Sequence, residues 1–219
     1  MITFESIKNN EDIKTYIEEA DKSLIALGFT EHSFAHVGRV ANVAKYILET
    51  LGYSQHEVEL VQIAAYLHDI GNLVNRVDHS LSGAVMAFRI LSNLNMPAND
   101  IAVITTAIGN HDEGTGVAVN PLAAALIIAD KSDVRYTRVR NRDSSTFDIH
   151  DRVNFSVKNS TVTIDDTHTA LILNLKVDTQ YSSVMDYFEI FLGRMIMCRK
   201  AAEKLGLIFK LVINDQQMI

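Results

Sequence analysis

The stretch Ala64-Ala65-Tyr66-Leu67-His68-Asp69-Ile70-Gly71 places an imidazole and a carboxylate at the end of an otherwise apolar helix. A capping box, Ser54-Gln55-His56-Glu57, predicts where this helix begins, and Gly71 predicts where it ends. The apolar positions of the helix put His68 beside its core-facing side. Burial of such polar groups costs free energy unless they are paired or bound to a metal, so both groups need partners.

Two other predicted helices combine apolar and ionisable residues in the same way. Asp130 follows eight apolar residues, Leu122 to Ala129, and must be paired, protonated or bound to a metal if it is buried. His36 shares a helical face with Val40 and Ile47. Taken singly, a histidine on an apolar face is usually a satisfied core residue, and a buried aspartate is usually a cap or an ion-pair partner. Three such cases on three core helices favour a shared site.

The composition of the chain narrows the possible functions. Its 219 residues are 47% hydrophobic, which is enough for a core and argues against intrinsic disorder. Its formal net charge of −7 argues against binding to extended nucleic acid and leaves room only for a local basic patch. The single cysteine excludes a disulfide framework and a zinc site of several thiolates, so any metal site must use imidazole and carboxylate groups. With no secretory signal and no apolar run long enough for a bilayer, we expect a cytoplasmic protein.

The sequence predicts a mainly α protein in two parts. Residues 1–148 read as consecutive helices, and residues 149–219 read as a small α+β appendage packed against them. The helices expected in the first part cover residues 15–27, 32–51, 54–71, 79–94, 101–108 and 120 onward into an arginine-rich stretch. The expected order in the appendage is βββαβ, with strands at 152–158, 161–164 and 170–177, a helix at 183–205 and a strand at 207–213.

Three motifs resemble the H…HD…D signature of the HD-domain metal-dependent phosphohydrolases, a superfamily built on a helical bundle. They are His36-Val37-Gly38-Arg39-Val40, Leu67-His68-Asp69-Ile70-Gly71 and Ala129-Asp130-Lys131-Ser132-Asp133. The resemblance covers about residues 30–145, and the order, the intervals and the helical context of the motifs all fit. It implies a metal ion bound by His36, His68, Asp69 and Asp130, with His68 and Asp69 in catalytic roles.

Two further histidines are similar to those of dinuclear HD proteins, which include HD-GYP cyclic-dinucleotide phosphodiesterases and HD-type diadenosine tetraphosphate hydrolases. His79 opens a predicted helix, and His111 lies in a loop with two glycines. In those relatives the counterpart of Asp69 bridges both ions and the extra histidines hold the second. The resemblance thus implies two divalent ions, and nitrogen and oxygen donors suit Fe or Mn, with Mg, Ni or Zn as further candidates. Alternatively, His79 caps its helix and His111 is an exposed loop residue.

The chain departs from the HD-GYP pattern in three places. Gly116 is followed by Val117-Ala118 where that subgroup has Tyr-Pro, and Asn72 stands where a lysine is often found. The interval from Asp69 to His79 is also short. Cyclic di-GMP is therefore not supported as the substrate, and the phosphate-binding residues must be sought elsewhere in the chain.

Basic residues gather directly after Asp130. If the helix continues, Arg135, Arg138 and Arg142 share one face beyond that residue, and their guanidinium groups would suit phosphate oxygens. The alternative is a solvated basic face or a salt-bridged junction with the appendage. Asp133 also flanks the last ligand and could orient it. The candidate substrate-binding residues are Arg39, Lys131, Arg135, Arg138 and Arg142, with Arg76 as a further candidate.

Other residues receive structural interpretations. His32, four residues before His36 on the same helical face, could reach the substrate, but a solvated helix terminus is the preferred interpretation. His150-Asp151-Arg152 repeats the His-Asp dipeptide but enters a strand-like segment, so we interpret it as structural. Cys198 is expected to pack in the core along the C-terminal helix.

The expected activity is hydrolysis of a phosphomonoester or phosphodiester bond in a small phosphorylated molecule such as a nucleotide. Two ions that share Asp69 would lower the pKa of a bridging water and supply hydroxide near neutral pH. One alternative is a mixed-valent di-iron oxygenase, because HD-domain proteins such as myo-inositol oxygenase use a similar ligand set. Another is a signalling or scaffold domain, which typically lacks ligands. We expect no extended nucleic acid and no membrane as partners, and the exposed strand edge of the appendage would allow a homodimer.

Overall fold

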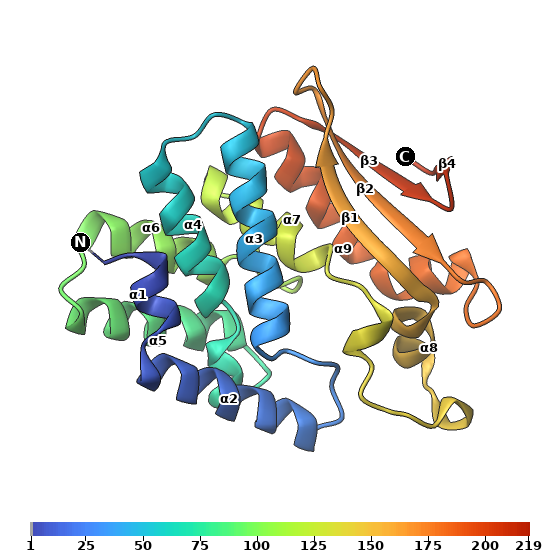
Figure 1. Cartoon of the computed structure of the whole chain (residues 1–219), viewed down its shortest axis with the longest axis horizontal. Helices are drawn as coiled ribbons and strands as arrows, with labels where there is room; N and C mark the ends of the chain where they lie inside the picture. Colours follow the sequence, from blue (N-terminus) through green and yellow to red (C-terminus); the bar gives the residue numbers. More distant parts are fainter. Residues whose placement is uncertain (1) are drawn as a thin grey trace.

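The computed structural model describes residues 2–219 and shows a helical part packed beside a smaller α+β part (Figure 1). The helical part contains α1 (Phe4–Lys8), α2 (Glu11–Ala26), α3 (Phe34–Thr50), α4 (Gln55–Leu67), α5 (His79–Asn93), α6 (Ala98–Gly109) and α7 (Pro121–Lys131). Short 3-10 turns occur at Ile70–Leu73, Tyr136–Arg138 and Ser144–Thr146. The second part contains α8 (Ile149–Ser156), β1 (Val157–Ile164), β2 (Ala170–Val177), α9 (Val184–Lys204), β3 (Ile208–Ile213) and β4 (Gln216–Gln217). The predicted fold class, mainly α with a small C-terminal α+β appendage, is confirmed.

The first element of the appendage corrects a prediction. Residues 149–156 form helix α8, whereas the alternation of apolar residues predicts a strand over 152–158, so the order βββαβ is wrong at its start. The side chain of Asp148 accepts a hydrogen bond from the backbone N–H of Asp151 and caps this helix, and the strand begins only at Val157. A division of the chain between residues 148 and 149 stays a prediction.

The helix ends of the first part bring its polar residues to one place. The capping box of α4 forms as predicted, with the Ser54 backbone N–H donating to the Glu57 carboxylate at 2.9 Å. Asn120 caps α7, whose apolar residues are buried on all sides. Helices α3, α4 and α7 pack against one another, and α5 packs against the 3-10 turn that follows α4. The start of α3, the end of α4 and the end of α7 therefore meet.

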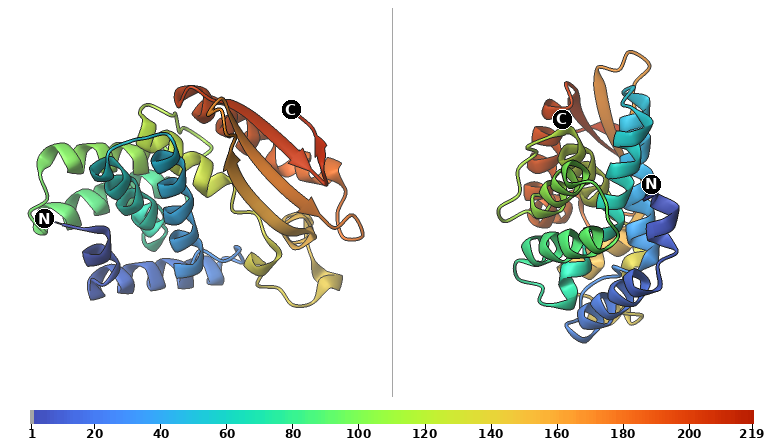
Figure 2. Two further views of the ribbon diagram at one scale, coloured as in Figure 1. Left: turned by 45° about the horizontal axis from the view of Figure 1, so that its top comes forward. Right: turned by 90° about the vertical axis from the view of Figure 1, so that its left-hand side faces the viewer.

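The appendage packs against the helical part through α9 and β1. Its sheet has the order β1-β2-β3-β4, and α9 connects the parallel neighbours β2 and β3. Helix α9 contacts both β3 and α7, and β1 contacts α3 directly, so the appendage meets the helical part through two elements (Figure 2). Cys198 of α9 is buried, as expected, and burial raises the pKa of its thiol to about 12. Within residues 2–219, no helix combines the length and the apolarity needed to cross a bilayer.

Gly71 permits the closest approach of two segments in the helical part. A Cβ atom at this position would lie 1.9 Å from the backbone oxygen of His79 and 2.5 Å from the backbone nitrogen of Gly83. The first turn of α5 therefore rests directly on the backbone that follows Asp69. No other residue type leaves room for this contact.

We predict that Gly71→Ala lowers the free energy of unfolding by ~2 kcal/mol or more, because the added methyl group meets backbone atoms that cannot rotate away. Gly38→Ala is the matched control, since no heavy atom lies within 4 Å of a Cβ atom built there in α3. That control should raise the free energy of unfolding by about 0.5–1 kcal/mol. Urea denaturation followed by circular dichroism measures both, and equal stability of Gly71→Ala and wild type would contradict the close packing.

Candidate metal centre

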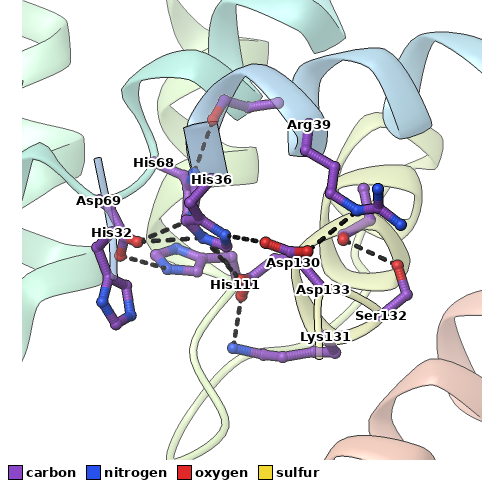
Figure 3. A network of polar contacts seen from close by, with 12 residues as sticks. His32, His36, Arg39, His68, Asp69, His111, Asp130, Lys131, Ser132 and Asp133 are labelled. Atoms are coloured by element: carbon purple, nitrogen blue, oxygen red, sulfur yellow. Dashed lines mark hydrogen bonds and ion pairs between the residues drawn. The ribbon is translucent and has the colours of Figure 1, made fainter. Parts of the chain in front are cut away.

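All six residues predicted as metal ligands lie together in the structure (Figure 3 shows five of them). They come from the first turn of α3, the chain after α4, the start of α5, the chain after α6 and the end of α7. These residues are His36, His68, Asp69, His79, His111 and Asp130. Their side chains are largely buried, and that of Asp130 is the most exposed at 12%. The alternative interpretation of His111 as an exposed loop residue is wrong, because it is 1% exposed.

Asp69 directs its two carboxylate oxygens at two different pairs of imidazoles. Its Oδ2 atom lies 3.5 Å from His36 Nε2 and 3.2 Å from His68 Nε2. Its Oδ1 atom lies 3.4 Å from His79 Nε2 and 3.9 Å from His111 Nε2. One carboxylate thus connects two clusters of nitrogen donors, which is the arrangement that two cations sharing a bridging carboxylate require.

Asp130 completes the first of these clusters. Its Oδ1 atom lies 3.4 Å from His36 Nε2 and 3.7 Å from His68 Nε2. Its Oδ2 atom lies 2.7 Å from the Lys131 ammonium group, which keeps the other oxygen turned toward the histidines. Burial opposes ionisation of Asp130, but Lys131 and the neighbouring histidines outweigh it and hold the pKa well below its usual value. The cluster therefore contains a buried negative charge at this position.

Each of the four histidines turns its Nε2 atom toward the cluster because its Nδ1 atom is held by an acceptor. The Nδ1 contacts are His36 to Asp133 Oδ2 at 2.8 Å, His68 to Ala65 O at 2.6 Å, His79 to Arg76 O at 3.1 Å and His111 to Ile108 O at 2.6 Å. Carbonyl and carboxylate oxygens only accept hydrogen bonds, so Nδ1 carries a proton in each ring, and Nε2 offers a lone pair to the cluster wherever it is not itself protonated. Histidines that bind metals in proteins are oriented in this way.

The Nε2 atoms of the four histidines lie close enough together to bind cations. His79 Nε2 and His111 Nε2 lie 3.2 Å apart, and the Nε2 atoms of His36 and His68 are buried without a hydrogen-bond partner. Protonation of Nε2 would provide a positive charge at His68 but not at His111. Burial lowers the pKa of His68, but Asp69 and Asp130 outweigh burial and raise it to about 10. Burial and then the charge of His68 lower the pKa of His111 to about 3. Imidazole nitrogens and carboxylate oxygens that face one another in this way suit divalent metal ions.

Asp133 holds His36 in position and is itself held by arginines. The carboxylate is 1% exposed, forms an ion pair with Arg39 Nε at 3.0 Å and accepts a hydrogen bond from Arg135 Nε at 2.8 Å. Arg138 Nη1 donates to the backbone oxygen of Asp133 at 2.7 Å. Arg39 and Arg135 therefore point to Asp133, and neither lines the cavity that the predicted role in substrate binding requires.

The appendage supports this arrangement through β1. The hydroxyl group of Ser160 donates to the backbone oxygen of Ser132 at 2.6 Å, and Arg39 donates to the backbone oxygen of Ser160. Arg39 thus connects β1 with Asp133, which in turn orients His36. The position of one histidine in the cluster depends on a strand more than 120 residues away in the sequence.

A cavity of about 320 Å³ opens beside the cluster. Asp69, His79 and Asp130 form part of its wall, which places the proposed metal site at its edge. Four cationic side chains also line it, namely Arg76, Lys131, Arg138 and Arg194. The wall also contains four carboxylates, those of Asp69, Asp130, Asp148 and Asp151, so the cationic side chains stand beside an equal number of acidic groups.

The arginine-rich stretch differs from the prediction. Helix α7 ends at Lys131, and a 3-10 turn at Tyr136–Arg138 follows, so the expected shared helical face does not form. Arg138 lines the cavity, whereas Arg142 is exposed beside a different surface depression.

Several residues that line the cavity were assigned no site role, or only a secondary one, from their positions in the sequence. His32 lines it, and α8 contributes His150 and Asp151, which we interpreted as structural. Arg194 comes from the middle of α9, where it pairs with Glu113 at 2.7 Å. No spacing in the sequence relates Arg194 to the HD motifs, because only the packing of the appendage brings α9 to the site.

Comparison with known proteins finds an HD domain in the helical part. Residues 33–135 match the family model of the HD domain, the region in which the three motifs lie. An uncharacterized protein of Methanocaldococcus jannaschii is 28% identical over 176 residues, which cover 68% of this chain and 66% of that protein. The chain thus spans slightly less than two thirds of this relative. A crystal structure of a predicted HD superfamily hydrolase from an uncultured Thermotogales bacterium is 27% identical, with a TM-score of 0.44, and the match covers 57% of this chain and 67% of that one.

We predict that Asp133→Asn weakens metal binding roughly 10–100-fold, because the amide can accept a hydrogen bond from His36 Nδ1 only if its NH2 group faces the guanidinium groups of Arg39 and Arg135. Asp100→Asn is the matched control, since Asp100 also pairs with a histidine, His56, at 2.9 Å but outside the cluster. Competition with a chromophoric chelator measures the affinity of both variants for Mn²⁺. Equal affinities in the two variants would show that Asp133 does not position His36.

Proposed function

We propose that the protein is a metal-dependent phosphohydrolase that cleaves a phosphomonoester or phosphodiester bond in a small phosphorylated molecule such as a nucleotide. The observation that carries this proposal is the position of Asp69, between two pairs of imidazoles and at the wall of a cavity that also contains four cationic side chains. The match of residues 33–135 to the HD-domain model supports a metal-dependent hydrolase. The cationic lining supports a phosphorylated substrate, because guanidinium and ammonium groups bind phosphate oxygens.

The residues divide into two sets that would each hold one divalent ion. His36, His68 and Asp130 would hold the first, His79 and His111 would hold the second, and Asp69 would contact both. Fe or Mn is the proposed metal, given a donor set of imidazole nitrogen and carboxylate oxygen. When bound, the ions would lower the pKa of a water molecule and neutralise charge on the phosphoryl group.

The chain's own cations are proposed to bind the phosphate. Arg76 makes no ion pair within residues 2–219 and donates to Asn72 Oδ1 at 3.2 Å, so its charge is available in the cavity. Its Nη1 atom lies 3.4 Å from His79 Nε2, next to the proposed second ion. Lys131 and Arg138 share the cavity but already contact Asp130 and the backbone, respectively. Arg76 is therefore the foremost candidate for substrate binding.

The metal content of variants tests the division of ligands. We expect two ions per chain in wild type, about one in His79→Ala and none in Asp69→Ala, because Asp69 contacts both sets. His56→Ala, which removes a half-exposed histidine outside the cluster, should keep both ions. Mass spectrometry of metals after dialysis gives the stoichiometry, and circular dichroism verifies folding. Two ions retained by folded Asp69→Ala would refute the shared carboxylate.

Hydrolysis tests the proposed reaction itself. Protein loaded with Mn or Fe should release phosphate, or a phosphorylated fragment, from at least one member of a panel of small phosphate esters. Asp69→Ala should lower the rate on the order of 100-fold or more, since it removes support from both ions. Oxygen consumption by iron-loaded protein without any phosphate ester cleavage would reject the proposal and favour the oxygenase.

Arg76→Gln should lower kcat/KM about 10–100-fold, mainly through KM, because it removes a charge-assisted hydrogen bond worth roughly 1.5–3 kcal/mol. The matched control is Arg142→Gln, which removes an equal charge from the exposed position outside the cavity. Steady-state kinetics on the best substrate of the panel compares the two variants. A similar effect in both variants would show that only net charge matters and that Arg76 has no direct role.

A further inference from the structure

An apolar stripe lies on the solvent side of α5. Leu81, Val85 and Phe88 are 52%, 69% and 54% exposed, and their spacing of four and three residues puts them on one side of the helix. Val77, in the turn before the helix, is 73% exposed and extends the stripe. The opposite side of α5 already packs in the protein through Ala84, Ala87 and Leu91, among others. A helix that is apolar on its solvent side as well has a surface available for a partner.

Two opposite charges flank the stripe. Asp78 lies immediately before α5 and Arg89 lies eleven residues later, directly after Phe88, so one charge stands near each end of the helical part of the stripe. Both residues are exposed, and neither forms an ion pair within residues 2–219. Two opposite charges on one surface are self-complementary under a twofold axis, because the carboxylate of each copy can then face the guanidinium group of the other.

We infer that the protein forms a homodimer in which α5 pairs antiparallel with α5 of a second copy. With the twofold axis midway between residues 83 and 84, Asp78 of each copy faces Arg89 of the other. This axis also crosses the apolar stripe between Leu81 and Val85, so the same twofold axis relates the apolar contacts and the charge pairs. The pairing is typical of an antiparallel two-helix contact with apolar residues spaced by three and four.

The strand edge that we first considered for a dimer is partly used within the chain. The outer edge of β1 faces α3, where Tyr46 Oη accepts from the backbone N–H of Ile164 at 3.0 Å and Arg39 donates to the backbone oxygen of Ser160. These contacts reduce the number of backbone groups that β1 could offer to another copy. By contrast, no other segment within residues 2–219 covers the apolar stripe of α5.

The molar mass in solution tests the inference without any measurement of activity, so it is independent of the proposed function. At ~100 µM, well above the Kd of a specific dimer, light scattering coupled to size exclusion should give twice the 24.4 kDa of one chain. Val85→Asp should give the monomer mass, whereas Met185→Asp, which charges a 74% exposed position on α9, should leave the dimer unchanged.

A charge exchange tests the register. Asp78→Lys and Arg89→Glu should each weaken the dimer, because each variant on its own brings like charges together. An equimolar mixture of the two variants should restore the dimer mass, because every cross-pair then joins opposite charges. A monomeric wild type, or a dimer that persists in Val85→Asp, would overturn the inference. Failure of the mixture to recover would overturn the proposed register.

Discussion

The structure depends on a single carboxylate that faces four imidazoles. Each oxygen of Asp69 lies within 4 Å of two Nε2 atoms, and those atoms are turned inward because every Nδ1 atom is occupied by an acceptor. The helix ends, the close contact at Gly71 and the buried end of α7 all serve to bring these groups within reach. A cluster of this composition would be unfavourable in a core that had no cations to bind.

The support for this cluster extends through both parts of the protein. Asp133 orients His36, arginines fix Asp133, and one of these arginines also binds the backbone of β1. Helix α9 of the appendage contributes Arg194 to the cavity, and α8 contributes His150 and Asp151. The appendage is thus built into the site, which gives it a physical role that is independent of any interface.

The sequence predicted the cluster well because its residues interrupt strong local patterns. His68, Asp69 and Asp130 stand out behind apolar helices, and Ser54 and Asn120 mark helix starts through their side chains. Of the candidate basic residues, Arg76, Lys131 and Arg138 line the cavity, whereas the positions of the others depend on tertiary partners. Arg39 and Arg135 bind Asp133, and Arg142 lies at the surface, since the chain leaves helical geometry after Lys131. The segment 152–158 was misassigned because its alternation also fits a short helix capped by Asp148.

The central claim is that one carboxylate serves two metal ions. The most direct measurement is anomalous X-ray diffraction from crystals of the protein loaded with manganese. Our account predicts two anomalous peaks about 3.5–4 Å apart, one on each side of the Asp69 carboxylate. A single peak, or two peaks of which only one contacts Asp69, would contradict it.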